Sequence, residues 1–471
     1  MEYLQLLFQE FLLMAVILII FMMKLVGQEN NKRNTAGFLA ILSLLFINFI
    51  AGLFMPFEGT AFAGMFEVRE IDIWQKNILN AGLFLIGLQS YDWFRRNRIM
   101  PEYFMLLLLS LLGMFFMISS GHFLVFYLGL ELATLPLVVL TAIEKKKQRS
   151  AEAGMKFILS SMFSSAILIM GLSFIYGGTG SFYFDQIAIA TSNILIVAGL
   201  AMLITGFAFK LSLVPFHLWT ADVYEGAPVN VTTFLSVISK GAVFFIFLTT
   251  LYKVFPSIEF IWDKMVMVLA IITMTVGNLF ALRQTNMKRF LAFSSISQAG
   301  YILLGVVAGG AVGVTAVTYF ILVYLFSNLA AFGVASAISV RTGKENISDY
   351  NGLYSTHPLL SIVLFLALFS LAGIPPLAGF FGKFFLLMAA AGKGIYWLVF
   401  IAAINMIISL YYYLKVIRAI FMEKNEKPLR VFTSSIFTRL SLTICALGIF
   451  VIGFIGYIYD FIYEISLIIL P

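Results

Sequence analysis

Long apolar runs recur along the chain and are separated by short polar connections. A helix that crosses a bilayer needs about 20 predominantly apolar residues, and about fourteen windows of that length can be drawn. The pattern therefore predicts an all-α polytopic membrane protein with about fourteen transmembrane helices. The windows lie at 6–25, 35–54, 74–92, 101–118, 122–143, 153–176, 193–219, 229–252, 262–283, 288–308, 311–340, 358–388, 396–421 and 438–459.

Composition supports lipid as the main surroundings of the chain. Hydrophobic residues make up 61% of the 471 residues and charged residues 11%, whereas soluble domains carry about 25% charged residues. The net charge of +7 comes mostly from basic residues in the short connections. That placement is typical of topology signals, so we expect a lipid bilayer and no nucleic acid as partner.

The basic residues concentrate in every second connection, for example within 145–149, 283–289 and 415–439. Cytoplasmic loops carry an excess of lysine and arginine. The alternation therefore predicts that both termini lie on the outer side. On this interpretation the outer connections carry only Arg69, Lys76, Lys253, Lys264 and Lys393.

Four lysines are left once the basic residues assigned to connections are set aside, and all four lie within apolar windows: Lys156, Lys210, Lys240 and Lys383. A lysine at the centre of a membrane helix costs about 3 kcal/mol on insertion scales. Such residues are candidates for proton transfer, although each could instead extend to an interface or form a static ion pair. The second interpretation is strongest for Lys156, which lies near the inner end of its helix.

Acidic residues complete the candidate proton-transfer set. Glu131 lies in the middle of the fifth window, where a carboxylate needs a partner, and Lys210 is the partner that we expect. Separating the two would release the lysine proton, so the pair could act as a switch. Glu102, Glu144 and His217 are possible proton-uptake groups, although the two glutamates could equally be ordinary interfacial carboxylates.

Prolines interrupt the seventh and twelfth windows beside two of these lysines. Pro215 follows Lys210, and Pro375 with Pro376 precedes Lys383. Proline removes a backbone donor, and in lipid the freed carbonyls need water or protein as partners. Two breaks five helices apart predict inverted five-helix repeats, helices 4–8 and 9–13, although incidental kinks remain an alternative. The predicted segments are 1–100, 101–255 (first repeat), 256–421 (second repeat) and 422–471.

This chain has few side chains that could ligate a metal or a redox centre. Cys445 is the single cysteine, and His122, His217 and His357 are isolated. One cysteine cannot ligate an iron–sulfur cluster. We therefore expect no metal and no cofactor in this chain.

The stretch from Lys210 to Pro228 resembles the signature of the subunit N family of respiratory complex I, the proton-translocating NADH:quinone oxidoreductase. The motifs Tyr127–Leu132, Lys288–Ser297 and Gly373–Pro376 add to the likeness, which covers residues 100–420. Pro-Phe-His-x-Trp-Thr-x-Asp-Val-Tyr separates this family from subunits L and M and from the Mrp antiporter subunits.

The resemblance implies a proton half-channel from each side, joined by a polar axis and driven by quinone reduction in partner subunits. It implies that the family's buried glutamate is Glu131 and that its lysines are Lys156, Lys210, Lys240 and Lys383. It also implies a bacterial inner membrane, M-, K-, J-, A- and H-like membrane subunits as partners, and a peripheral arm. FMN, iron–sulfur clusters and quinone are expected in those partners.

Two positions depart from the family pattern. Ala221 stands where the family often has proline, and Gln298 stands where it often has histidine. Gln298 cannot titrate, so the second half would need water around it. A subunit of a multisubunit Na⁺/H⁺ antiporter remains the main alternative, and a stand-alone secondary transporter is a weaker one.

Overall fold

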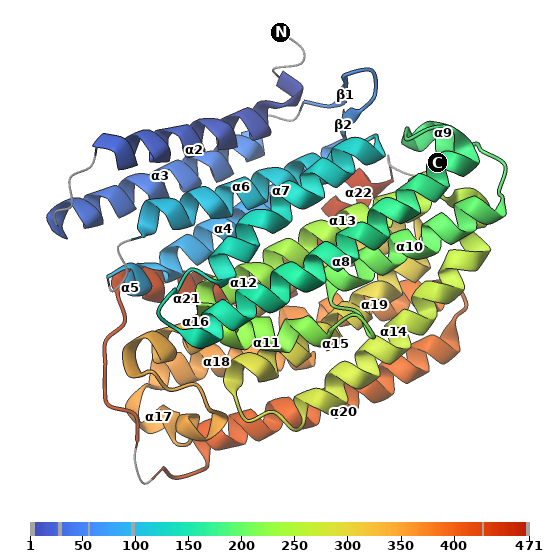
Figure 1. Ribbon diagram of the computed structural model, residues 1–471. Coiled ribbons are helices and arrows are strands. Elements are labelled where there is room, and N and C mark those ends of the chain that lie inside the picture. Colours follow the sequence, from blue (N-terminus) through green and yellow to red (C-terminus); the bar gives the residue numbers. More distant parts are fainter. Residues whose placement is uncertain (1–4, 27–30, 55–56, 96–98, 426–427, 468–471) are drawn as a thin grey trace.

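Helices that run side by side make up nearly all of the molecule, which is a computed structural model (Figure 1). It describes residues 5–26, 31–54, 57–95, 99–425 and 428–467. The first half contains α2 (Phe8–Val26), α3 (Asn31–Phe54), β1 (Gly59–Ala61), β2 (Phe66–Val68), α4 (Glu70–Gln89), α5 (Tyr91–Phe94), α6 (Met100–Ile118), α7 (Phe123–Thr141), α8 (Gln148–Thr179), α9 (Phe184–Ala188), α10 (Ile194–Leu211), α11 (Leu218–Gly226), α12 (Val229–Phe234), η1 (Leu235–Ser239), α13 (Lys240–Thr249) and η2 (Thr250–Val254).

The second half continues the same layer of helices. It contains η3 (Pro256–Ile258), α14 (Glu259–Ala281), α15 (Met287–Ala308), α16 (Gly310–Thr342), η4 (Ile347–Tyr350), α17 (Leu353–Thr356), α18 (Pro358–Ala372), α19 (Ala378–Gly392), α20 (Tyr396–Phe421), α21 (Ile436–Phe454) and α22 (Tyr457–Ser466). In Figure 1, α2 and α3 form one edge, and α14 and α20 form the opposite edge.

The apolar windows correspond to helices throughout the described ranges. Within these ranges, 12 helices are long and apolar enough to cross a membrane. The window 74–92 corresponds to α4, which is not among those 12, and the window 358–388 corresponds to the shorter helices α18 and α19. The all-α membrane architecture is therefore confirmed. The count of fourteen, the inverted repeats and the outer position of the termini remain predictions.

Three central segments carry the interior of the protein. The membrane window of α15 is 100% buried, that of 229–254 is 94% buried and that of α16 is 89% buried. The windows of α2, α3 and α20 are buried to only 28–33%. A charged side chain on α13 or α15 is therefore surrounded by protein rather than by lipid, which lowers its cost.

A short hairpin that the apolar pattern did not predict closes one end of the molecule. Strands β1 and β2 pair antiparallel, and Phe66 also bridges to Ser120 between α6 and α7. A Cβ at Gly121 would lie 2.3 Å from the Gly64 oxygen, so only glycine fits there. The hairpin thus seals the tight turn that returns the chain into α7.

The prediction that Lys76 lies in an outer connection is wrong. Lys76 is on α4 with 1% of its side chain exposed, and its ammonium lies 2.6 Å from Glu10 on α2, which is also 1% exposed. The rings of Phe66 and Phe115 lie 5.4 and 5.6 Å from the ammonium. A buried pair of this kind offsets the desolvation of each charge only while both partners remain.

We expect Lys76→Met to destabilise the protein by about 3–5 kcal/mol, because it leaves the Glu10 carboxylate buried without a counter-charge. The double variant Glu10→Leu with Lys76→Met should recover most of that loss, because no charge is left unpaired. Thermal unfolding of the purified assembly measures both effects. Lys146→Met, at an exposed position, is the control. A double variant no more stable than the single one would contradict this interpretation.

Candidate proton-transfer site

The seventh predicted span is broken between α10 and α11, as its proline predicts. Ser212 adopts a left-handed conformation (φ 61°), and the peptide between Val214 and Pro215 is cis. Side chains from outside the helix form hydrogen bonds with backbone groups that the break leaves without helical partners. The Val214 amide donates to Thr273 Oγ1 (3.0 Å), and the Trp219 indole donates to the Phe209 carbonyl (3.1 Å). The break is therefore a built feature that places α11 as a separate short helix.

The twelfth span is broken in a similar way between α18 and α19. Gly373 closes α18 at φ 86°, a conformation that favours glycine. The peptide between Pro375 and Pro376 is cis. Lys383 on α19 turns back and donates to the carbonyls of Leu371 (2.7 Å) and Ala372 (3.2 Å). The ammonium thus satisfies the carbonyl end of α18, where the helix dipole favours a cation.

Lys383 is buried, with 1% exposure. Its ammonium lies 4.7 Å from the centre of the Tyr301 ring, a cation–π distance. Among the ion pairs of the described residues none includes Lys383. Its charge is held by neutral groups alone.

Lys240 has the same character on the central helix α13. It is 3% exposed, donates to Ser295 Oγ (2.9 Å) and lies 5.8 Å from the Tyr224 ring centre. The π-helical turn η1 ends immediately before it. Such turns are frequent at functional sites because they change the direction of the side chains that follow. No acidic partner of Lys240 occurs in the described part of the chain.

Lys210, partly buried at the end of α10, meets hydroxyl groups from two other helices. Its ammonium donates to Thr134 Oγ1 on α7 (2.8 Å) and to Ser161 Oγ on α8 (3.1 Å). Glu131 lies one turn from Thr134 and accepts from Ser165 Oγ (2.5 Å), one turn from Ser161. The direct ion pair that we predicted between Glu131 and Lys210 is not formed within the described residues, because these hydroxyls occupy the ammonium.

Two sets of hydrogen bonds lie between Lys240 and Lys383, and they meet at the adjacent residues Ser295 and Ser294 on α15. Ser295, the partner of Lys240, neighbours Ser294, whose hydroxyl lies 2.5 Å from that of Tyr413 on α20. The Gln298 amide donates both to Tyr413 Oη (3.2 Å) and to the Leu371 carbonyl (3.0 Å), which Lys383 also contacts. The second half of the axis is therefore joined by side chains and by the Leu371 carbonyl, except that Ser294 and Ser295 are neighbours along α15 without a hydrogen bond to each other among the described residues. No such direct connection links Lys210 to Lys240 in the described residues.

Buried polar atoms without a hydrogen-bond partner gather around this axis. Buried groups of this kind are normally satisfied by protein or ordered water. Their concentration around the α10–α11 break and along α15 indicates where water would bind between the lysines. Within the described residues they include Ser212 Oγ, Thr220 Oγ1, Tyr224 Oη, Ser297 Oγ, Gln298 Oε1 and Tyr301 Oη.

Lys156 does not share this environment, and its part in proton transfer remains a prediction. Its side chain is 43% exposed and pairs with Glu152 and Asp222, each at 2.7 Å. These ion pairs agree with the alternative interpretation, in which the Lys156 side chain extends to an interface. Lys156 lies near one end of α8.

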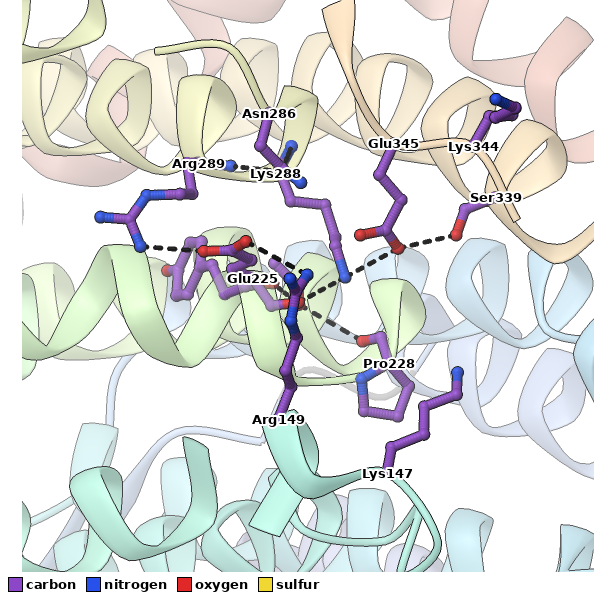
Figure 2. Close-up of polar contacts among 12 residues, drawn as sticks. Lys147, Arg149, Glu225, Pro228, Asn286, Lys288, Arg289, Ser339, Lys344 and Glu345 are labelled. Carbon is purple, nitrogen blue, oxygen red and sulfur yellow. Dashed lines mark hydrogen bonds and ion pairs between the residues drawn. The ribbon is translucent and has the colours of Figure 1, made fainter. Parts of the chain in front are cut away.

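Ion pairs hold α11 against its neighbours at the end of the molecule where Lys156 lies. Arg289 on α15 contacts Asp222 (2.7 Å) and Glu225 (2.9 Å). Figure 2 shows Lys288 reaching between the Glu225 carbonyl and the Glu345 carboxylate, which is 3.0 Å away. These contacts fix the short helix that follows the Lys210 break.

The possible uptake groups take different positions. Glu102 pairs with Lys24 (2.9 Å) and is 38% exposed, and Glu144 pairs with Lys147 (2.9 Å). His217, in the α10–α11 break, is buried, and its Nδ1 has no partner among the described residues. The structure therefore gives the two glutamates interfacial ion pairs and places His217 beside the axis.

Donors for a metal or redox centre are not brought together in the described residues. Cys445 is buried in α21, and no group of three histidine, cysteine, aspartate or glutamate residues forms there. The side chains present therefore do not fit an iron–sulfur cluster.

Comparison with known proteins defines the class first. Residues 120–409 match the family described as "NADH:quinone oxidoreductase/Mrp antiporter, TM". This match covers more than half of the chain and includes Glu131, Lys210, Lys240 and Lys383. The chain is therefore an antiporter-like membrane protein of that family.

Full-length relatives narrow the class. The chain is 48% identical over 467 residues to NADH-quinone oxidoreductase subunit N of Azobacteroides pseudotrichonymphae, with 97% of each covered. It belongs to the subunit N family of NADH-quinone oxidoreductase.

Solved structures agree with this assignment. A chain of respiratory complex I from Thermus thermophilus is 28% identical, with a TM-score of 0.80, over 94% of this chain and 96% of that chain. A chain of the Mrp complex from Dietzia shares the fold, with a TM-score of 0.85 over 99% and 97%, at 21% identity.

Burial alone would raise the pKa of the Glu345 carboxyl, but the Lys288 charge and hydrogen bonds from Lys288, Ser339 and Asn286 lower it below its usual value. A lowered pKa stabilises the folded state above the pKa of the unfolded chain, and that stability is lost as pH falls through the folded pKa.

Glu345→Gln should therefore lower the unfolding temperature at pH 7, and the difference from the unchanged protein should shrink as the pH falls below about 4.5. Thermal unfolding at both pH values measures this. Glu58→Gln, at an exposed position, is the control. A difference that is equal at pH 7 and pH 4 would argue against the ion pair.

Proposed function

We propose that this chain is the antiporter-like membrane subunit of a proton-pumping NADH:quinone oxidoreductase, and that it moves protons along Lys210, Lys240 and Lys383. The observation that carries the proposal is the set of partners of these lysines. Each ammonium is held by hydroxyls, carbonyls or aromatic rings, without a direct acidic partner among the described residues. A lysine held by neutral groups can lose and regain its proton without leaving a buried carboxylate unpaired.

Lys210, Lys240 and Lys383 form the lysine row. Glu131, next to Lys210 at one end of this row, controls whether Lys210 keeps or releases its proton. Glu131 on α7 accepts from Ser165 on α8, and the Lys210 ammonium donates to Thr134 and Ser161, one turn away on the same two helices. A small shift of Glu131 toward Lys210 adds an attractive charge and holds the proton on the lysine, and the reverse shift removes that attraction. Ser161, Ser165 and Thr134 can exchange partners during this movement, because a hydroxyl both donates and accepts.

The lateral path divides into two parts with different chemistry. From Lys240 to Lys383, the hydroxyls of Ser294, Ser295 and Tyr413 carry the connection, and Gln298 holds Tyr413 against the Leu371 carbonyl. From Lys210 to Lys240, ordered water beside Thr220 and Tyr224 would complete the path. Gln298 itself has a positioning role, because an amide does not titrate.

Proton uptake is assigned to the end of the molecule at which Lys156 and Asp222 lie. Lys156, Glu144 and Glu102 would collect protons at the inner surface, and His217 would lie next to the path. Both termini would then lie on the outer side of a bacterial inner membrane, in keeping with the distribution of basic residues.

Partner subunits would supply the energy. Other complex I membrane subunits, M-, K-, J-, A- and H-like, would adjoin this chain and connect it to the peripheral arm. FMN, iron–sulfur clusters and quinone would reside in those partners. For the clusters, the reason is that the single cysteine and the other metal donors of the described residues do not come together.

A subunit of a Na⁺/H⁺ antiporter complex is the second candidate, supported by the fold shared with the Mrp chain. The two functions differ in their driving reaction. An antiporter forms a pH gradient when Na⁺ is added without an electron donor. The proposed subunit requires NADH oxidation, and its proton transport does not depend on Na⁺.

Lys240→Met should lower NADH-driven proton transport roughly tenfold or more in inside-out membrane vesicles, because a positioned proton-transfer group typically contributes about 10²–10⁴-fold. Lys210→Met and Lys383→Met should act in the same direction. Lys156→Gln should have a smaller effect, because its side chain is exposed and lies away from the row.

Lys264→Met, at an exposed position on α14, is the matched control and should leave transport unchanged. Assembly is checked by the amount of intact complex in the same membranes. Normal proton transport in all three row variants would refute the proposed path.

Glu131→Gln should slow transport, and combining it with Lys210→Met should add little further loss, because both changes remove one switch. Initial rates of proton transport for the four members of this double-mutant cycle measure the coupling. Losses that multiply in the double variant would show that Glu131 and Lys210 act independently.

A further inference from the structure

A groove lies between α17, α18 and α20, away from the lysine row. It has a volume of about 890 Å³ and is open to the surroundings. Tyr354, Phe365 and Phe421 form part of its wall, with ring centres 5.1 and 5.7 Å apart. The remaining apolar lining residues are Ile362, Leu366, Tyr411, Leu414, Ile417 and Met422.

Two basic residues, Lys415 and Arg418, also line this groove, which has no acidic lining residue. Lys415 forms no ion pair within the described residues. Arg418 lies 3.8 Å from Glu423, a wide separation between two exposed side chains. The groove therefore carries net positive charge beside an apolar surface.

The groove matches one leaflet of a bilayer in length. Its lining residues on α20 run from Tyr411 to Met422, about 16 Å at 1.5 Å per residue, which is half of a hydrocarbon core of about 30 Å. Residues 411, 414, 415 and 418 are spaced along one helix face. Along α20, Lys415 and Arg418 lie beyond Tyr411 and Leu414 toward the end of the helix, and Phe421 and Met422 follow them. The deeper apolar part of the groove thus runs along the acyl-chain region, and the two cations lie nearer to one membrane surface.

We propose that this groove is a binding site for one anionic phospholipid. The headgroup phosphate contacts Lys415 and Arg418, and an acyl chain lies along Phe365, Leu366 and Leu414. Basic pockets between membrane helices bind acidic headgroups by this combination of charge and apolar contact. A neutral lipid would leave the two cations without a counter-charge.

The test uses the intact complex, reconstituted in nanodiscs with a photo-crosslinkable phosphatidylglycerol or the matching phosphatidylcholine. Peptide mass spectrometry identifies the labelled residues. Phosphatidylglycerol should label α18 and α20 at the groove roughly tenfold more than phosphatidylcholine does. Equal labelling by the two lipids would overturn the proposal, because it would indicate ordinary surrounding lipid.

Two variants separate the headgroup contacts from the apolar groove. Lys415→Gln with Arg418→Gln removes the charges, and Leu366→Trp fills the groove while keeping them. Both should lose the phosphatidylglycerol labelling about tenfold, whereas the control Lys145→Gln with Lys146→Gln should retain it. Retained labelling in the charge variant, or cross-links from the groove to a partner subunit in place of lipid, would also overturn the proposal.

Discussion

An ammonium group inside a membrane protein is stable only if the surrounding groups replace the water that it has lost. In this chain the replacement comes from neutral groups: hydroxyls at Lys210 and Lys240, and helix-terminal carbonyls at Lys383. A direct carboxylate contact would hold each proton more tightly and oppose its transfer. The rest of the architecture places these neutral groups where the ammonium groups need them.

The broken helices follow from this constraint. An intact helix uses its own carbonyls, but α18 ends early and leaves those of Leu371 and Ala372 free for Lys383. The break after Lys210 likewise frees α11, which brings Tyr224 to 5.8 Å from Lys240. Ion pairs from Arg289 and a hydrogen bond from Lys288 to the Glu225 carbonyl then hold α11 in place (Figure 2). Each helix break therefore lies beside a buried lysine, whose charge the freed backbone or the neighbouring short helix helps to stabilise.

Much of this could be predicted from the sequence, because hydropathy and proline act locally. The apolar windows matched helices, and the prolines marked both breaks. Lys240 lies in the middle of its apolar window and Lys383 lies just past the double proline, and both are buried as predicted.

Other features depend on contacts between distant parts of the chain. Lys76 was assigned to a connection because a buried lysine needs a partner, and its partner, Glu10, lies 66 positions away in the sequence. The hydroxyls of Thr134, Ser161 and Ser165 are common residue types, and only the packing of α7, α8 and α10 gives them a role. Hydropathy alone could not show that the Lys156 side chain would be 43% exposed and paired with Glu152 and Asp222. The π-helical turn before Lys240 has no sequence signature of its own.

The most direct measurement is a cryo-electron microscopy map of the intact complex at a resolution that shows ordered water. The account predicts water within hydrogen-bond distance of the Lys210, Lys240 and Lys383 ammonium groups, and a water chain beside Thr220 and Tyr224 between the first two. Dry, sealed pockets around these amines, or a gap without water between Lys210 and Lys240, would contradict the account.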